Sequence, residues 1–219
     1  MLEFVVMNDD VQEVLNAFCS NYKELNYRKG DIVIRGDDEP TGVYLIKSGN
    51  VKMSSIDEDG DELSVNIYKP GTFFPMTWAI GKIENSYNYQ TLSPSKLVRV
   101  PKEEFTKFLK DNPEVLYDLT RRIVIGLDGT LFNLRHLLGS SSVSKIAVIL
   151  YMFARRFGVT NGSQIEIDLP LTHQDISHFI GLSRETTTIG INKLVKDGII
   201  VQNQRKLIIK DIEALKKAF

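Results

Sequence analysis

The chain of 219 residues has almost no cysteine, no long apolar run and no basic N-terminal stretch. Its one cysteine, Cys19, excludes an internal disulfide and any site held by several thiolates, and we interpret it as a small buried hydrophobe. No apolar run approaches the roughly 18 residues of a membrane span. The N-terminal stretch MLEFVVMNDD lacks the basic residues that open a signal peptide. These absences predict a cytoplasmic protein without membrane contact.

Common catalytic motifs are also missing. The three histidines are His136, His173 and His178. No nucleophile elbow, glycine-rich phosphate loop or HExxH motif accompanies them. The sequence therefore predicts no enzyme activity, no metal and no cofactor.

The net charge of −1 hides an asymmetry along the chain. Residues 1–139 hold 16 Lys and Arg against 21 Asp and Glu, a net of −5. Residues 140–219 hold 11 against 7, a net of +4. This difference indicates that the C-terminal part meets a polyanion and that the N-terminal part has another task.

The first third of the chain is typical of β structure. It contains short runs rich in Val, Ile, Leu and Tyr, namely DIVIRGD, GVYLIKSGNVKMSSI, ELSVNIY and KLVRVP. Asp59-Gly60 predicts a hairpin turn between strands at 51–56 and 63–68. Many short antiparallel strands predict a β-sandwich or jelly-roll barrel within residues 1–112.

A helical period follows from Pro101. The stretch KEEFTKFLKDNP predicts a short helix, and residues 113–138 predict a long one. One face of this long helix, its seam, is made of residues that recur every three or four positions: Leu116, Leu119, Ile123, Gly126, Thr130, Leu134 and Leu137. A second copy of the helix is the simplest partner for this seam, although packing on its own barrel is an alternative and both can hold on different faces. The small, polar stretch GSSSVS at 139–144 predicts a hinge.

Residues 139–219 combine helices with short strands. Thr172 and Asp175 form a capping-box pattern before one short helix, and Ser183 is a good N-cap for the next. Ile191, Leu194 and Val195 predict the buried stripe of that second helix. The stretch IIVQNQRKLIIKD then predicts a hairpin with residues 203–205 at its tip. A helix, a turn, a helix and a β-wing together predict a winged helix-turn-helix, and the whole chain an α+β fold.

The sequence resembles the bacterial Crp/Fnr transcription factor family over nearly its whole length. GVYLIKSGNVKM is similar to the strand-turn-strand signature of the cyclic-nucleotide-binding barrel. The long helix before a small-residue hinge resembles the family's dimerisation helix. LTHQDISHFIGLSRETTTIGINKLVKDGII resembles its DNA-binding motif, with Ser-Arg-Glu-Thr opening the recognition helix.

The resemblance implies contact with double-stranded DNA. Arg184 can pair with guanine O6 and N7, and Glu185 can accept from cytosine N4. The residues expected to contact bases or phosphates are Arg184, Glu185, Thr186, Thr188, Ile189, His173, Gln174, Arg205 and Lys206. Ile189 stands where cyclic-AMP-responsive members carry a second base-reading Arg. It would therefore contact the methyl group of a thymine at the position where those members select a guanine. The alternative is that Ile189 turns inward and reads nothing.

The resemblance does not extend to the cyclic-AMP site. In members that bind this nucleotide, a Glu holds the ribose and an Arg-Ser or Arg-Thr pair holds the phosphate. Here Met76 stands at the Glu position, and Ser86 and Tyr87 stand at the Arg-Ser positions. No Arg lies between Arg35 and Arg99 to balance the phosphate charge.

The chain also lacks most of the residues that hold the other cofactors of this family. The iron–sulfur type needs an N-terminal cysteine cluster, and the haem type needs a His or Cys that only His136 and Cys19 can supply in this half. Six residues are candidates for an apolar effector pocket: Phe73, Phe74, Met76, Trp78, Tyr87 and Tyr89. They can equally fill the barrel as ordinary core, which leaves an unidentified small-molecule effector or none.

The sequence thus predicts a homodimeric transcription regulator that binds an inverted-repeat operator. RNA polymerase is a further candidate partner. The alternative is a ligand-binding or scaffolding protein whose winged helix binds another protein instead of DNA.

Overall fold

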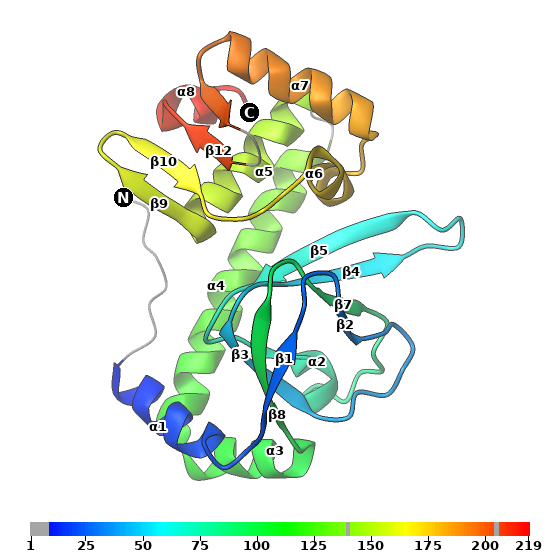
Figure 1. The fold of residues 1–219 in the computed structure, drawn as a ribbon, viewed down its shortest axis with the longest axis vertical. Coiled ribbons are helices and arrows are strands. Elements are labelled where there is room, and N and C mark those ends of the chain that lie inside the picture. Colours follow the sequence, from blue (N-terminus) through cyan, green and yellow to red (C-terminus); the bar gives the residue numbers. More distant parts are fainter. Residues whose placement is uncertain (1–8, 139–140, 204–205) are drawn as a thin grey trace. The chain divides into compact units, whose positions relative to one another are not determined.

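A computed structural model describes residues 9–138, 141–203 and 206–219 of the chain (Figure 1). It divides into two compact units, one that runs to Ile123 and one that begins at Val124. The long helix α4 (Pro113–Leu137) contains this division. Four members of the predicted set lie outside the described residues, namely Gly139 and Ser140 of the expected hinge and Gln204 and Arg205 of the expected wing tip.

Two antiparallel four-stranded sheets form the centre of the N-terminal unit. One contains β1 (Glu24–Tyr27), β8 (Ser95–Val100), β3 (Val43–Ser48) and β6 (Phe73–Phe74), in that order. The other contains β2 (Ile32–Ile34), β7 (Asn88–Thr91), β4 (Val51–Ile56) and β5 (Glu62–Tyr68), in that order. Apart from the β4–β5 hairpin, neighbouring strands come from distant parts of the chain, as in the pairs β1–β8, β3–β8 and β4–β7. The two sheets confirm the predicted sandwich of short antiparallel strands.

Turn chemistry sets the ends of these strands. The β4–β5 hairpin closes at Asp57, whose Oδ1 accepts from the backbone N–H groups of Asp59 and Asp61 at 3.1 and 2.8 Å. Between β3 and β4, Gly49 adopts a φ of 84°, and a Cβ there would lie 2.1 Å from Ser95 Oγ. Only glycine fits this turn, because a side chain would meet both backbone strain and a clash.

Helices pack against the strands of the N-terminal unit, and the buried residues between them form one of its hydrophobic clusters. The helices are α1 (Asp9–Cys19), α2 (Met76–Ala79), α3 (Lys102–Asp111) and the start of α4. Sequence reasoning missed α1, although Val11, Leu15 and Cys19 recur every four residues and are all buried. Cys19 is the buried hydrophobe that the sequence predicted, and its burial raises the pKa of the thiol to about 11.

The helix α4 begins at Pro113, a position where proline loses no helical hydrogen bond. Val115 and Leu119 of its first turns pack into the core of the N-terminal unit. Asp118 is also buried, and it pairs with Arg122 Nε at 2.8 Å. Arg122 Nη1 in turn donates to the carbonyl oxygen of Gly71 at 2.8 Å, so the helix is bonded to the turn before β6.

In the C-terminal unit, α5 (Ser142–Phe157) packs against the sheet and against the other helices of the unit. This sheet contains β11 (Ile200–Asn203), β12 (Lys206–Ile209), β10 (Gln164–Ile167) and β9 (Gly158–Asn161), in that order. The helices α6 (His173–Ile180) and α7 (Arg184–Lys196) form the helix-turn-helix, and α8 (Ile212–Lys217) follows the sheet. The strand β9 and the helix α8 were not predicted.

The described part of the predicted hinge belongs to α5. Ser141 is its N-cap, with its hydroxyl accepting from Ser144 N at 3.2 Å, and Ser142 already starts the helix. Serines favour caps as much as loops, so their number alone overstated the length of the linker.

Candidate nucleic-acid interface

Local caps define the angle between α6 and α7. Thr172 and Asp175 form the predicted capping box at the start of α6. Gly181 ends this helix in the left-handed region, with φ 60° and ψ 44°. Ser183 then caps α7 through Thr186 N at 3.1 Å. Three adjacent signals therefore produce a tight turn between two helices, as the sequence predicted.

One face of α7 packs against its own unit. Thr187, Gly190, Ile191 and Leu194 are buried there. A Cβ at Gly190 would lie 2.3 Å from Ile146 Cδ1 of α5, so the absence of a side chain lets these helices approach. Val195 is 37% exposed, and its prediction as part of the buried stripe is wrong. The stripe instead runs through Thr187, whose hydroxyl donates to the Ser183 carbonyl at 3.0 Å.

The opposite face of α7 carries the side chains expected to read bases. Arg184 and Glu185 are exposed in its first turn. Ile189 is 71% exposed, so the alternative in which it turns inward does not hold. Thr186 is half-buried, and its hydroxyl accepts from Ser183 Oγ at 2.9 Å. The front of the helix thus presents one cation, one anion and one bare aliphatic group to a partner.

The start of α6 lies beside this face through His173. Its Nδ1 is 2.9 Å from Thr188 Oγ1, and its Nε2 is 3.0 Å from Gln202 Nε2 in β11. Gln174, also expected at the interface, lies with its Nε2 2.5 Å from His178 Nε2 in the same helix. The two residues predicted at the start of α6 thus already make side-chain contacts inside the unit. Gln202 also belongs to this group, although no sequence pattern predicted it.

The wing forms from β11 and β12, paired from Ile200 with Ile209 to Asn203 with Lys206. Lys206 is exposed, but its ammonium lies 2.5 Å from Glu166 Oε1 of β10. This hydrogen bond and charge raise the pKa of Lys206. The predicted phosphate contact of Lys206 would therefore share its charge with a carboxylate that the sequence analysis did not consider.

The six candidate effector residues do not gather around one cavity. Phe73 is buried in a cluster under α1, α3 and α4, and Met76 and Trp78 pack against this cluster. Phe74 and Tyr89 are buried in a second cluster between the sheets, and Tyr87 packs against that one.

Aromatic rings fill the second cluster. Phe74 stacks with Tyr89 at 4.9 Å between ring centroids, with Tyr44 at 5.5 Å and with Tyr68 at 5.8 Å. Burial raises the pKa of the Tyr89 phenol strongly. The space between the sheets is thus packed with side chains, as in ordinary core.

The segment around Ser86 and Tyr87 is bonded to a neighbouring loop. Asn85 is 8% exposed, and its Nδ2 donates to the carbonyls of Arg35 and Tyr87 at 2.8 and 3.0 Å. Asn88 Oδ1 accepts from Gly36 N at 2.9 Å. Amide side chains therefore fix the backbone on both sides of Ser86 and Tyr87.

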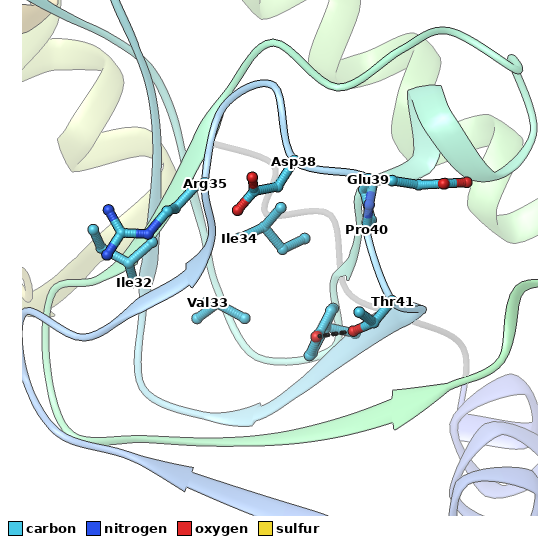
Figure 2. Close-up of a pocket in the computed structure, with 9 residues that line it drawn as sticks. Ile32, Val33, Ile34, Arg35, Asp38, Glu39, Pro40 and Thr41 are labelled. Carbon is cyan, nitrogen blue, oxygen red and sulfur yellow. Dashed lines mark hydrogen bonds between the residues drawn. The ribbon is translucent and has the colours of Figure 1, made fainter.

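A surface pocket of about 200 Å³ is lined by residues of the same loop (Figure 2). Its walls come from β2, the loop that follows it and Tyr44 of β3. The hydroxyls of Thr41 and Tyr44 lie 3.1 Å apart in it. None of the six candidate effector residues lines this pocket, and the charged stretch RGDDEPT was its only sequence signal.

The seam predicted for α4 needs a correction. Leu119 is 5% exposed and belongs to the core of the N-terminal unit, so it cannot also meet a partner helix. Leu116, Ile123 and Leu134 are exposed as expected. The exposed apolar residues of the helix are Leu116, Tyr117, Ile123, Val124, Ile125, Leu127, Leu131 and Leu134, and Leu138 directly after the helix is exposed as well. The apolar stripe thus lies about one residue further round the helix than predicted. Gly126 and Thr130 are exposed beside it, and Leu137 is half-buried.

Two further features concern only the described residues. No helix among them has the length and apolar character to cross a membrane. In the same part of the chain, no three His, Cys, Asp or Glu side chains are grouped so that they could hold a metal ion.

Comparison with known proteins agrees with this architecture. A family model for the cyclic nucleotide-binding domain matches residues 24–112, and one for the Crp-like helix-turn-helix domain matches residues 144–218. The chain is 26% identical to the HTH-type transcriptional regulator ArcR of Staphylococcus haemolyticus over 196 residues, which cover 90% of this chain and 86% of that protein. It is 27% identical to the global nitrogen regulator of Nostoc sp. over 184 residues, which cover 83% and 82% of the two chains.

The fold has solved counterparts. A CooA mutant from Carboxydothermus hydrogenoformans superposes with a TM-score of 0.76 at 23% identity, covering 98% of this chain and 99% of that one. The relatives are regulators and not enzymes, which agrees with the missing catalytic motifs. The matched sensor domain, the long helix and the matched helix-turn-helix together show that this chain belongs to the Crp/Fnr family of DNA-binding transcription regulators.

Proposed function

We propose that the protein is a homodimer that reads an inverted-repeat operator, with one α7 in each of two successive major grooves. The observation that carries this proposal is the division of α7 into a buried face and an exposed front with Arg184, Glu185 and Ile189. A helix held in this way can enter a groove without exposing its core. The half-sites should then lie about one helical turn apart, because the dimer has two-fold symmetry.

The exposed stripe of α4 supports the dimer. Ile123, Leu127, Leu131 and Leu134 are each more than half exposed in the single chain. A contiguous apolar surface of this kind favours a partner, and its spacing suits a second copy of the same helix. A dimer formed through this stripe would have two-fold symmetry, and a symmetric operator would follow from it.

The half-site follows from the three exposed side chains. Arg184 and Glu185 fit the two members of a G·C pair. Ile189 has no donor for guanine, so it fits a thymine methyl group, and the half-site becomes richer in A·T at that position. Replacement of Ile189 by Arg would then restore a guanine there.

The N-terminal unit would respond to a signal other than cyclic AMP, or to none. Met76, Ser86 and Tyr87 offer no counter-charge for a cyclic phosphate, and Asn85 ties this segment to the Arg35 loop. Any signal would reach the DNA through α4 and the residues before α5, and RNA polymerase would be the partner of the bound dimer.

Selection of duplexes from a random pool tests the proposal. Wild-type protein should enrich an inverted repeat, and its affinity should fall steeply as salt rises, because phosphate contacts release counterions. The alternative, a winged helix that binds another protein, predicts no salt-dependent duplex binding and no enriched sequence. Enrichment of an asymmetric single site would contradict the dimer alone.

A further inference from the structure

A chain of hydrogen bonds links α6, α7 and β11 through the hydroxyl of Thr188. Thr188 Oγ1 lies 2.9 Å from the carbonyl oxygen of Arg184 and 2.9 Å from His173 Nδ1. On the other side of the imidazole, His173 Nε2 lies 3.0 Å from Gln202 Nε2 and 3.3 Å from Gln202 Oε1. Thr188 is half-buried and sits one residue before the exposed Ile189.

The number of hydrogens assigns a direction to each bond. The carbonyl of Arg184 can only accept, so the single hydroxyl hydrogen of Thr188 is donated there. His173 Nδ1 must then be the donor toward Thr188. A neutral imidazole with its hydrogen on Nδ1 accepts at Nε2, and the nearer atom of Gln202 is its donor nitrogen.

The opposite assignment is poorer. If Thr188 donated to Nδ1, the carbonyl of Arg184 would lose that hydrogen bond. Nε2 would also have to donate to Gln202 Oε1 over 3.3 Å instead of accepting over 3.0 Å. The three short distances therefore agree on one arrangement, in which His173 donates to Thr188.

This arrangement leaves the Thr188 hydroxyl as an acceptor without a free hydrogen. One lone pair receives the His173 N–H, and one remains for a partner at the exposed face of α7. In the major groove, adenine N6 and cytosine N4 are the base groups that donate, whereas guanine and thymine offer acceptors.

We propose that Thr188 selects a base with an exocyclic amino group, adenine or cytosine, and that His173 and Gln202 are positioning residues that keep its hydroxyl in this acceptor state. The inference rests on the proposed DNA-binding function and specifies one further position of the half-site. It also gives His173 a role inside the protein instead of a direct contact with phosphate.

The test starts from the duplex that wild-type protein selects. The base facing Thr188 is replaced by an analogue without the amino group, purine for adenine or pyrimidin-2-one for cytosine. Wild-type affinity should fall about fivefold, the value of one ordinary hydrogen bond. Thr188→Val keeps the shape without the hydroxyl, so it should bind both duplexes equally and correct for any change in the duplex itself. Thr188→Ser keeps the hydroxyl and should retain the discrimination.

A second pair of variants tests His173. In His173→Ala the Thr188 hydroxyl can rotate and donate, so guanine or thymine at this position should bind within about twofold of the selected base. His173→Asn places an amide N–H at the Nδ1 position and should restore the preference. Thermal melting checks that each variant folds, and base preference is a readout that a merely structural histidine would not change.

Three outcomes would overturn the inference. Equal wild-type affinity for the analogue would remove it and leave the proposed function standing. Discrimination retained in Thr188→Val would do the same. No salt-dependent duplex binding by wild-type protein would remove the proposed function and this inference together.

Discussion

The two compact units of this chain use their polar side chains in opposite ways. In the N-terminal unit, Asn85 is buried and bonds to backbone, and Asp118 and Arg122 hold α4 to the turn at Gly71. In the C-terminal unit, Arg184 and Glu185 project from α7 into solvent. Polar groups that already have protein partners stabilise a fold, whereas exposed groups on a rigid helix remain for a ligand. The contrast teaches that the side chains proposed to read DNA belong to the second unit, where they have no role in its core.

The largest test of this contrast concerns two leucines of α4. Leu119→Ala should lower the free energy of unfolding by about 2–5 kcal/mol, because it empties a core position. Leu127→Ala removes a side chain that is 56% exposed and should leave the folded unit intact while it weakens the dimer. Denaturant unfolding and sedimentation at one concentration separate these effects. Equal loss of stability in both variants would contradict the assignment of the two faces.

The packing of α7 on α5 gives a smaller expected effect. Gly190→Ala brings a Cβ within 2.3 Å of Ile146 Cδ1 and should cost about 1–3 kcal/mol of stability. Ile146→Val deletes that methyl group, so the double variant should recover part of the loss. Thermal melting of the four proteins measures the coupling, and additive losses would show that Ile146 is not the obstacle.

Loss of base reading by Arg184 should cost a similar free energy, but the cost should appear in DNA binding and not in the stability of the fold. Arg184→Ala should weaken operator binding by about 1–3 kcal/mol and relax the preference at one guanine. Arg184→Lys keeps the charge without the bidentate fork, so it should preserve the salt slope and still lose the guanine preference. Affinities for operators altered at that pair decide the matter. An unchanged base preference in either variant would contradict base reading.

The smallest effect is expected in the wing. Glu166→Gln removes the carboxylate that pairs with Lys206 and should free the ammonium for a phosphate, steepening the salt slope by about one. Lys206→Ala should change the slope in the opposite direction and alter no base preference. Binding titrations across a salt series measure both. A slope that is the same in all three proteins would show that Lys206 stays outside the interface.

The predictions that succeeded depend on neighbouring residues. The capping box of Thr172 and Asp175, the Ser183 cap and the turn at Gly60 need only a few adjacent side chains, so local sequence determines them. The strand runs of the N-terminal unit were predicted for the same reason. The helix α1 had an equally local signal in Val11, Leu15 and Cys19, and it was overlooked.

The predictions that failed depend on which element lies opposite. Leu119 and Leu127 are both apolar residues of one helical pattern, and the sequence does not say that the barrel covers only the first. Val195 follows the helical period but is exposed. For the six effector candidates the sequence left a pocket and an ordinary core as open alternatives. The alternation of β6 sends Phe73 and Phe74 into different core clusters, which agrees with the second alternative.

By itself, the sequence determined the order of the elements, the caps of the helix-turn-helix, the basic second half and the missing counter-charge for a cyclic phosphate. These features follow from residue types and short spacings. Only the tertiary structure decided which face of α4 stays exposed, that rings fill the space between the sheets, and that Glu166 and Lys206 meet. It also joined His173, Thr188 and Gln202, which are distant in the chain. Each of these depends on contacts between segments, and no local pattern encodes which segments will meet.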